Sequence, residues 1–202
     1  MNKISHYLKW NSFRDLVEEK RLRIFSLSDL IRIFPANKEV LKHFLSRHAK
    51  EGHLVRLKRG LYTLKNFTPD EMTLANRLYI PSYLSLEYAL SYYSIIPESV
   101  YSVTSVTTKP TRTFVCLGKT FTYQKIKHKA FFEYTAKERN EGSVFIASPE
   151  KAMADYLYFV SLGTRNRNDR TNWKVVDIEK IKNILKEKFE LPRKTILKLT
   201  EI

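Results

Sequence analysis

Cationic and polar side chains recur over residues 38–50, and a second basic group follows at residues 56–59. The candidate DNA-binding residues are Lys38, Lys42, Ser46, Arg47 and Lys50, then Arg56, Lys58 and Arg59, with Ser28 from an earlier helix. Lysine and arginine bind phosphate oxygens, and side chains of an exposed helix can contact base edges in the major groove. A serine at a helix N-terminus can also bond a phosphate. These residue types predict recognition of double-stranded DNA.

The histidines and the single cysteine form no recognisable metal-binding motif in the sequence. The histidines are His6, His43, His48, His53 and His128, and no pair stands in the HExxH arrangement or a comparable metal spacing. Cys116 alone makes neither an internal disulfide nor a cysteine-based zinc site. His48 falls on the apolar stripe of its helix, which favours a place in the core. We therefore predict no metal and no cofactor.

Carboxylates are the remaining candidates for catalysis, because a pair of them can hold a magnesium ion for hydrolysis of nucleic acid. A metal-dependent nuclease or RNA-modifying enzyme would use Glu87 or Asp155. Glu150 is better explained as an acid in the first turn of a helix, where its charge complements the helix dipole. The sequence has no glycine-rich phosphate loop and no GxSxG motif. We predict that the protein is not an enzyme, with the nuclease as the alternative.

Three helices and a hairpin are expected to position the basic residues of the first third. Helices are predicted over 11–21, from Ser26 or Ser28 to Pro35, and over 38–51, and a hairpin over 53–64 has its tip at residues 58–60. The predicted inner faces are Leu27, Leu30, Ile31 and Phe34 in the second helix, and Val40, Leu41, Phe44, Leu45 and His48 in the third. This order of elements is typical of a winged helix-turn-helix.

The rest of the chain alternates between helix and strand patterns. Helices are predicted over 70–79, from 86 to Pro97, from Pro149 to 160, and over 177–189 and 192–201; strands are predicted over 100–108, 111–117, 119–126 and 143–147. Ser85 and Ser148 are the predicted N-caps of two helices. The expected fold class is α+β. A winged helix-turn-helix domain occupies residues 1–66 and a mixed helix–strand domain occupies residues 67–202.

The positive charge of the chain is concentrated in its first third. The formal net charge is +15, of which residues 1–66 carry +9, and residues 67–202 carry +6 over twice the length. Such an excess favours a polyanionic partner, nucleic acid before an anionic membrane surface. The first domain is therefore the better candidate for contact with phosphate.

The second domain also holds two basic clusters, which are predicted to be a second contact for an anionic partner. They are Lys125, Lys127 and Lys129, which share one strand face if the strand extends that far, and Arg165, Arg167 and Arg170. A merely solvated surface explains either cluster equally well. Tyr92, Tyr93 and Tyr123 are candidates for exposed rings that stack bases or bind a partner protein, although core packing accounts for most aromatic residues here.

Composition limits the cellular setting. No apolar run approaches the roughly 18 residues that a membrane helix needs, and the N-terminal residues lack the apolar core of a signal peptide. A single cysteine suits a reducing compartment. We therefore expect a cytoplasmic protein with no membrane association.

Three stretches resemble one known family. They are the hairpin segment ending RGLYTL, the segment YLSLEYALSYYSIIPESVYSVTSVTTKPTRTF at residues 83–114, and IASPEKAMADYLY at residues 146–158. In this order they resemble the AbiEi family, the antitoxin half of a type IV toxin–antitoxin pair in phage defence. The resemblance covers about residues 13–160. Ser94 departs from the family pattern, which has a glycine before the IIPE segment.

The resemblance implies an antitoxin that represses its own operon through the winged helix-turn-helix. It also implies a second domain that counteracts a nucleotidyltransferase toxin without a stable complex. One small domain buries limited surface, so we expect two or more copies on inverted repeats of double-stranded promoter DNA. No coiled-coil seam is visible in the sequence, and we expect a monomer or weak dimer in solution. A transcription factor whose second domain senses a ligand is the other alternative.

Overall fold

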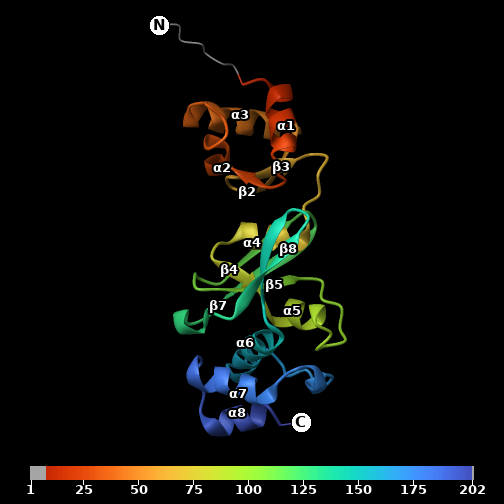
Figure 1. Cartoon of the computed structure of the whole chain (residues 1–202), viewed down its shortest axis with the longest axis vertical. Coiled ribbons are helices and arrows are strands. Elements are labelled where there is room, and N and C mark those ends of the chain that lie inside the picture. The colour runs from red at the N-terminus through yellow and green to blue at the C-terminus, as the bar shows by residue number, and fades with distance from the viewer. Residues whose placement is uncertain (1–7, 202) are drawn as a thin grey trace. The chain divides into compact units, whose positions relative to one another are not determined.

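Helix α1 (Trp10–Glu19) is the first helix in the part of the chain that the computed structural model describes, residues 8–201. It is followed by strand β1 (Phe25–Ser26), helices α2 (Leu27–Ile31) and α3 (Lys38–Lys50), and strands β2 (Leu54–Lys58) and β3 (Leu61–Leu64). The predicted three helices and the hairpin are therefore present (Figure 1). His6 and the other residues of the predicted first domain before Leu8 lie outside the described residues.

Side chains fix where α2 and α3 begin. The Ser26 hydroxyl accepts a hydrogen bond from the Asp29 backbone N–H at 3.2 Å, and the Asp29 carboxylate accepts one from the Ser26 N–H at 2.8 Å. This reciprocal capping box satisfies two backbone donors that the first turn of a helix leaves open. At the start of α3, the Asn37 side chain accepts a bond from the Glu39 N–H at 2.9 Å.

The core of this part of the chain is built largely from aromatic residues. Phe13 of α1 is fully buried and packs against the rings of Phe25, Phe34 and Phe44. The three strands form an antiparallel sheet in the order β1-β3-β2, which supplies Phe25 and Leu54 to the same core. Each element thus contributes its apolar face to one cluster, which fixes the orientation of α3.

Two residues predicted on inner helix faces are exposed instead, namely Ile31 and Val40. Their neighbours Leu30 and Leu41 are fully buried. Because successive residues of an α-helix point about 100° apart, a residue next to a buried one lies at the edge of a narrow apolar stripe. In α3 the stripe begins at Leu41, so the prediction for Val40 is wrong.

The chain divides into two compact units between Asp70 and Glu71. We call them unit 1 and unit 2. The boundary lies a few residues later than the predicted one, because the residues after β3 still contact unit 1. The Lys65 N–H donates to the His53 carbonyl at 3.0 Å, and the Arg23 guanidinium lies over the ring of Phe67 at 4.6 Å.

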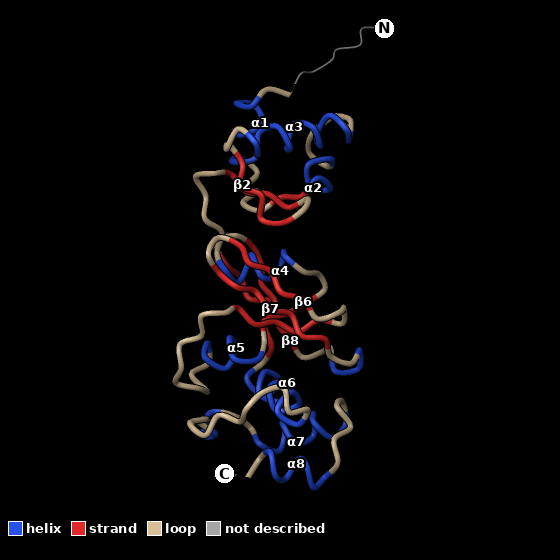
Figure 2. The backbone as a smooth tube through the Cα atoms, turned by 180° about the vertical axis from the view of Figure 1, so that it is seen from behind, coloured by secondary structure: helices blue, strands red, loops and turns tan. Residues whose placement is uncertain are grey.

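In its described residues, unit 2 combines a six-stranded mixed sheet with five α-helices and two short 3₁₀ helices. The α-helices are α4 (Glu71–Leu78), α5 (Leu86–Tyr92), α6 (Pro149–Ser161), α7 (Ile178–Glu187) and α8 (Arg193–Leu199), and the strands are β4 (Ser82–Leu84), β5 (Val103–Thr107), β6 (Arg112–Cys116), β7 (Lys119–Lys125), β8 (Tyr134–Arg139) and β9 (Gly142–Ala147). The strand order is β6-β7-β5-β4-β9-β8, with parallel pairs β4–β9 and β5–β7. Figure 2 draws the strands in red and labels β6, β7 and β8. The predicted α+β class is confirmed.

Helix α6 is the central helix of unit 2. The Ser148 hydroxyl accepts a hydrogen bond from the Lys151 N–H at 3.2 Å, and Pro149 occupies the first turn, where its missing N–H costs nothing. Helices α5, α7 and α8 pack against α6 or its neighbours (Figure 1). Within residues 8–201, no helix combines the length and the apolar character that a bilayer crossing requires.

Unit 2 departs from the sequence predictions at several places. Strands β4 and β8 are not predicted. Ser85 precedes α5 but does not cap it through its side chain, and its hydroxyl instead donates to Asp155 at 2.8 Å. Ser94 has a φ of 56°, in the left-handed region that glycine adopts without a Cβ clash. This is the position at which the resemblance in the sequence leads us to expect glycine.

Candidate nucleic-acid interface

Helix α3 has one buried face and one exposed cationic face. Leu41, Phe44, Leu45 and His48 are buried. The five predicted contacts of this helix, Lys38, Lys42, Ser46, Arg47 and Lys50, are all exposed. At about 100° per residue, the two sets occupy opposite halves of the helix. The structure therefore brings the five candidates together on one outer surface.

The carboxylate partners of Lys42 and Arg47 on this surface are exposed. Nζ of Lys42 lies 3.3 Å from a Glu39 carboxylate oxygen, and Nε of Arg47 lies 3.9 Å from Glu51. Exposed pairs of this kind contribute about 0–1 kcal/mol. A phosphate can replace either carboxylate at little cost, so these pairs leave the surface competent for an anionic ligand.

The hairpin of β2 and β3 carries the second basic group. Lys58 is opposite Leu61, and the chain turns through Arg59 and Gly60, whose φ of 80° favours glycine. Arg56 and Arg59 are exposed, and Lys58 is half-buried. Ser28 is exposed near the start of α2, but that helix has only five residues, so its dipole adds little to phosphate binding.

Three side chains that form no recognised metal-binding motif in the sequence meet at the C-terminal end of α3. They are His48, Glu51 and His53, whose ligand atoms all lie within 4.8 Å of one another. His48 is buried, as predicted for a core histidine, whereas Glu51 and His53 are exposed. Burial lowers the pKa of His48 because the charged imidazolium loses water, although the Glu51 carboxylate opposes this shift.

The helix terminus explains why these residues meet. The His53 N–H donates to the His48 carbonyl at 2.9 Å, and the Gly52 N–H donates to the Ala49 carbonyl at 3.3 Å. These two bonds are a Schellman motif, with Gly52 in the left-handed conformation at φ 75°. The motif places His48 and His53 side by side, although they are five residues apart. Residues that are neighbours on a helix are three or four apart, so helical periodicity does not predict this contact. The glycine after the helix predicts the turn that produces it.

The lysines predicted as a second anionic contact do not share a strand face. Strand β7 ends at Lys125, and Lys127 and Lys129 lie at a 3₁₀ turn, η1 (His128–Ala130). Both of the latter pair with Glu190, Nζ of Lys127 at 2.9 Å. Lys129 and then Lys127 hold the pKa of Glu190 down to about 2. The predicted shared face is wrong because the chain leaves the sheet after Lys125.

The arginines of the loop after α6 contact the protein itself. Nε of Arg165 lies 2.5 Å from Glu87, and Arg167 donates to the backbone carbonyls of Lys198, at 3.2 Å, and of Glu201. Arg170 is the most exposed of the three and lies 3.5 Å from Glu98. Arg165 and Arg167 therefore hold the loop to its neighbours rather than presenting free charge to a partner.

The two carboxylates of the nuclease alternative have separate partners. Glu87 pairs with Arg165, whereas Asp155 is fully buried and pairs with Lys151, the fourth residue before it in α6. Oδ2 of Asp155 also accepts hydrogen bonds from Tyr83 at 3.0 Å and from Ser85 at 2.8 Å. Glu87 and Asp155 thus pair with different basic residues, and Asp155 is committed to contacts within the core.

Lys151 and Asp155 are an ion pair in an apolar environment. Nζ of Lys151 lies 5.1–5.6 Å from the ring centroids of Tyr83, Phe132 and Phe189. Burial lowers the pKa of Lys151 and raises the pKa of Asp155, because both charged forms lose water, and their mutual attraction opposes both shifts. The aromatic rings and two hydroxyls replace part of the lost hydration.

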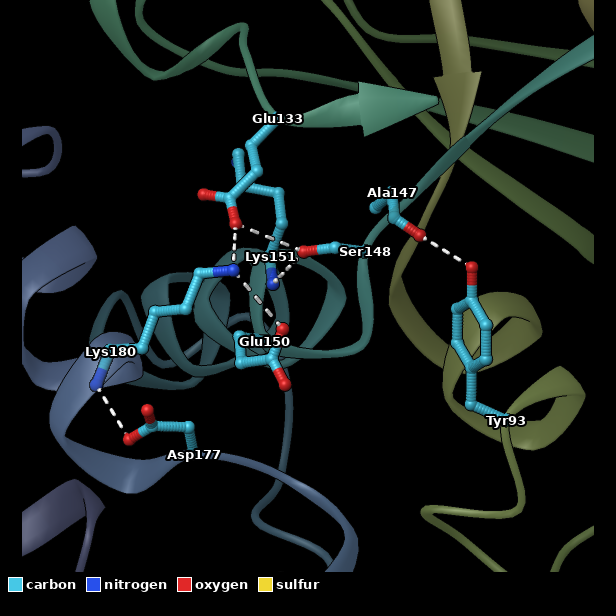
Figure 3. Close-up of polar contacts among 8 residues, drawn as sticks. All are labelled: Tyr93, Glu133, Ala147, Ser148, Glu150, Lys151, Asp177 and Lys180. Carbon is cyan, nitrogen blue, oxygen red and sulfur yellow. Dashed lines mark hydrogen bonds and ion pairs between the residues drawn. The ribbon is translucent and has the colours of Figure 1, made fainter. Parts of the chain in front are cut away.

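A second, more exposed ion-pair group links α7 to the start of α6 (Figure 3). Lys180 of α7 reaches two carboxylates, those of Glu133 and of Glu150, the latter at 3.4 Å. The Ser148 hydroxyl lies 3.3 Å from the same Glu133 carboxylate. The contact with Glu133 raises the pKa of Lys180. Glu150 is thus an acid in the first turn of its helix, as predicted, and also a partner for α7.

The tyrosines differ in their surroundings. Tyr123 is fully buried, and its hydroxyl donates to the Ala75 carbonyl at 2.6 Å, so the alternative of an exposed ring is wrong there. The Tyr93 hydroxyl donates to the Ala147 carbonyl at 2.9 Å (Figure 3). Tyr92 is exposed and remains a candidate for contact with a partner.

Two comparisons with known proteins found no relative of this chain. A scan against protein-family models and a search of curated proteins each found no match for the chain. The function must therefore be argued from the residues and their arrangement.

Proposed function

We propose that the chain is a DNA-binding antitoxin that represses its own operon and counteracts a nucleotidyltransferase toxin. The observation that carries the DNA-binding half is the exposed cationic surface of α3, opposite the face that anchors this helix in the core. A helix held rigidly from one side can enter a groove with the other.

We further propose that unit 1 is a winged helix-turn-helix. The order α1-β1-α2-α3-β2-β3 and the sheet order β1-β3-β2 support this assignment. In such a domain α3 enters the major groove, where side chains from its first turns contact base edges. The β2–β3 hairpin, with Arg56 and Arg59 exposed, lies along the phosphates beside it.

The salt dependence of operator binding tests this interface. We expect about five phosphate contacts per copy, so log K should fall with log salt at a slope of about −4.5. Lys42→Ala should reduce the magnitude of the slope by about 1, and Arg47→Ala should weaken binding by about tenfold or more. Titrations of promoter DNA containing the inverted repeat, at several salt concentrations, measure both quantities.

Lys20→Ala is the matched control for these two variants. Lys20 is also an exposed lysine of unit 1 in an exposed ion pair, but it follows α1 rather than lying on α3. Its removal changes the net charge equally and should leave affinity almost unchanged. Equal losses in all three variants would show that only the overall charge matters, and the α3 assignment would then fail.

The antitoxin half of the proposal is supported by the resemblance alone. The two longer matching segments, at residues 83–114 and 146–158, supply β4, α5, β5 and α6 of unit 2. They include Ser85 and Asp155, which bond each other in the core. The matching residues therefore include packing residues of unit 2.

Co-expression with a nucleotidyltransferase toxin tests this half. The double variant Lys42→Ala/Arg47→Ala should lose operator binding and still restore growth as well as the wild-type chain does. The reason is that the substituted side chains are exposed and belong to unit 1. Growth arrest that persists in the presence of the wild-type chain would contradict the antitoxin role and leave the DNA-binding role standing.

One feature favours the second candidate, a transcription factor that senses a ligand. Unit 2 has a pocket of about 420 Å³ whose lining includes Asn76, Phe131 and Tyr134. A volume of this size suits a small molecule. This candidate predicts that an effector releases the chain from promoter DNA, and that the chain gives no protection against the toxin.

A further inference from the structure

His48, Glu51 and His53 lie where α3 gives way to β2, and the proposed contacts with DNA use none of them. Nδ1 of His48 lies 2.8 Å from Oε2 of Glu51 and 3.1 Å from Nδ1 of His53. Nδ1 of His53 lies 3.4 Å from the same Oε2. We propose that these three atoms bind a first-row divalent metal ion, for which zinc is the best match.

The distances suit one ion bound by all three atoms. In a tetrahedral zinc site with bonds of about 2.0–2.1 Å, neighbouring ligand atoms stand about 3.3 Å apart. The three separations, 2.8, 3.1 and 3.4 Å, lie close to this edge length. Two imidazoles and one carboxylate are also a ligand set that zinc uses in proteins. The geometry thus matches three corners of a tetrahedron.

Hydrogen bonds cannot link every pair of atoms in the cluster at once. A hydrogen bond in each of the three contacts would require three hydrogens. A ring nitrogen carries at most one hydrogen and a carboxylate carries none, so the two nitrogens supply at most two. If both carry one, two donors face each other across the 3.1 Å contact between His48 and His53. A cation that accepts a lone pair from every member removes this conflict.

The neighbouring aromatic residues hold both imidazoles in place. The ring of Trp10 stacks on His53 with centroids 4.8 Å apart, and it lies at the same distance from His48. The Phe44 ring lies 4.2 Å from His48 on another side. Ligands that are already oriented lose little rotational freedom when an ion binds. The site is therefore organised before the ion arrives.

Two of the three ligands are open to solvent, because Glu51 and His53 are exposed. The ring of His53 also lines a pocket of about 210 Å³, together with Trp10 and Glu18. Three protein ligands leave one tetrahedral position open, and water commonly fills it. The ion would join the end of α3 to the start of β2, because His48 and Glu51 belong to the helix end and His53 precedes the strand.

Arg47 must move when the ion binds. Its Nη2 lies 3.3 Å from Nε2 of His48, so this nitrogen accepts a hydrogen bond and Nδ1 carries the hydrogen. A metal on Nδ1 requires the opposite tautomer, with the hydrogen on Nε2 facing a donor. The Arg47 side chain is 61% exposed and can leave. Removal of Arg47 should therefore leave zinc affinity equal to or greater than that of the wild-type chain.

Zinc titration of the untagged full-length chain tests the proposal. We expect one zinc ion per chain, and a rise in Tm of unit 1 because the ion binds only the folded site. His53→Asn and Glu51→Gln should each lower the affinity at least tenfold and abolish the rise in Tm. Both side chains are nearly half exposed, so neither change should unfold the domain. Cobalt in place of zinc should give the visible absorption bands of tetrahedral coordination.

His43→Asn is the control, since His43 is an exposed histidine of the same helix outside the cluster. It should bind zinc as the wild-type chain does. Three outcomes would overturn the proposal: wild-type binding no tighter than that of His53→Asn, equal losses in His43→Asn and His53→Asn, or a tenfold loss in Arg47→Ala. None of these measurements involves DNA, so failure here leaves the proposed repressor function untouched.

Discussion

A chain with methionine in place of Lys151 should lose about 3–5 kcal/mol of the free energy of unfolding of unit 2. Methionine fills most of the volume of the lysine stem but removes the ammonium group. Asp155 is fully buried and would then keep a carboxylate with no countercharge, with only the hydroxyls of Tyr83 and Ser85 to solvate it. Removal of one partner of a buried pair is costly for this reason.

Lys180→Met is the matched control. Lys180 also contacts two carboxylates, Glu133 and Glu150, but its side chain is 44% exposed, so water replaces the lost contacts. Its substitution should cost about 0–1 kcal/mol. The chain has two tryptophans, Trp10 in unit 1 and Trp173 in unit 2. In a Trp10→Phe background, fluorescence during urea unfolding therefore reports unit 2 alone.

The double variant Lys151→Met/Asp155→Asn shows how much of the lost unfolding free energy comes from breaking the charge pair and how much comes from the change in side-chain volume. Asparagine accepts the bonds from Tyr83 and Ser85 but carries no charge. The double variant should therefore be less destabilised than the sum of the two single variants, by at least about 1 kcal/mol. Strict additivity, or a loss below about 1 kcal/mol in Lys151→Met, would mean that the pair is not buried as a charged unit.

The sequence predicts those elements whose apolar periodicity matches their burial. α1, α3 and α6 each have a buried stripe, and α3 and α6 also begin at a capping side chain. All three are present within about two residues of their predicted bounds. Strand β8 escapes prediction because its residues, YTAKER, are mostly charged or small. It is an edge strand, where charged side chains face water and no apolar alternation is required.

Strand β4 is not predicted either, but here the reason is that the strand is short and wholly buried. It has three residues, all buried, between Pro81 and the start of α5. A run this short has no readable period, and its place in the sheet depends on pairing with β5 and with β9, which is more than fifty residues away. Such long-range pairing leaves no local mark in the sequence.

The candidate site, like the fold, could be predicted from the sequence only in part. The exposed residues of α3 follow from helical periodicity, because burial of one face fixes which side chains point outward. The partners of Lys127, Arg165 and Arg167 do not follow, because they come from Glu190, Glu87 and the end of α8, distant in the sequence. The carboxylate partners of the α3 cations are near them in the sequence, whereas those of the other basic clusters are far away, so helical periodicity predicts only the former.

Phe13→Ala should destabilise unit 1 by about 3–5 kcal/mol and weaken operator binding. Phe13 is fully buried and packs against Phe25, Phe34 and Phe44, which come from β1, from the residues after α2, and from α3. Its removal leaves a cavity where three elements meet. At roughly 0.05–0.15 kcal/mol per residue, a unit of about seventy residues has only about 4–10 kcal/mol to lose.

Phe67→Ala tests whether burial, and not simply loss of a ring, causes this effect. Phe67 is only partly buried, and its ring contacts the guanidinium of Arg23, so its loss should cost about 1 kcal/mol. In a Trp173→Phe background, the fluorescence of Trp10 reports unit 1, and Phe13→Ala should lower its urea midpoint far more than Phe67→Ala. The midpoint that Trp173 reports for unit 2 in a Trp10→Phe background should not change. Because every ring that Phe13 contacts belongs to unit 1, a parallel loss in unit 2 would mean that the two units unfold as one.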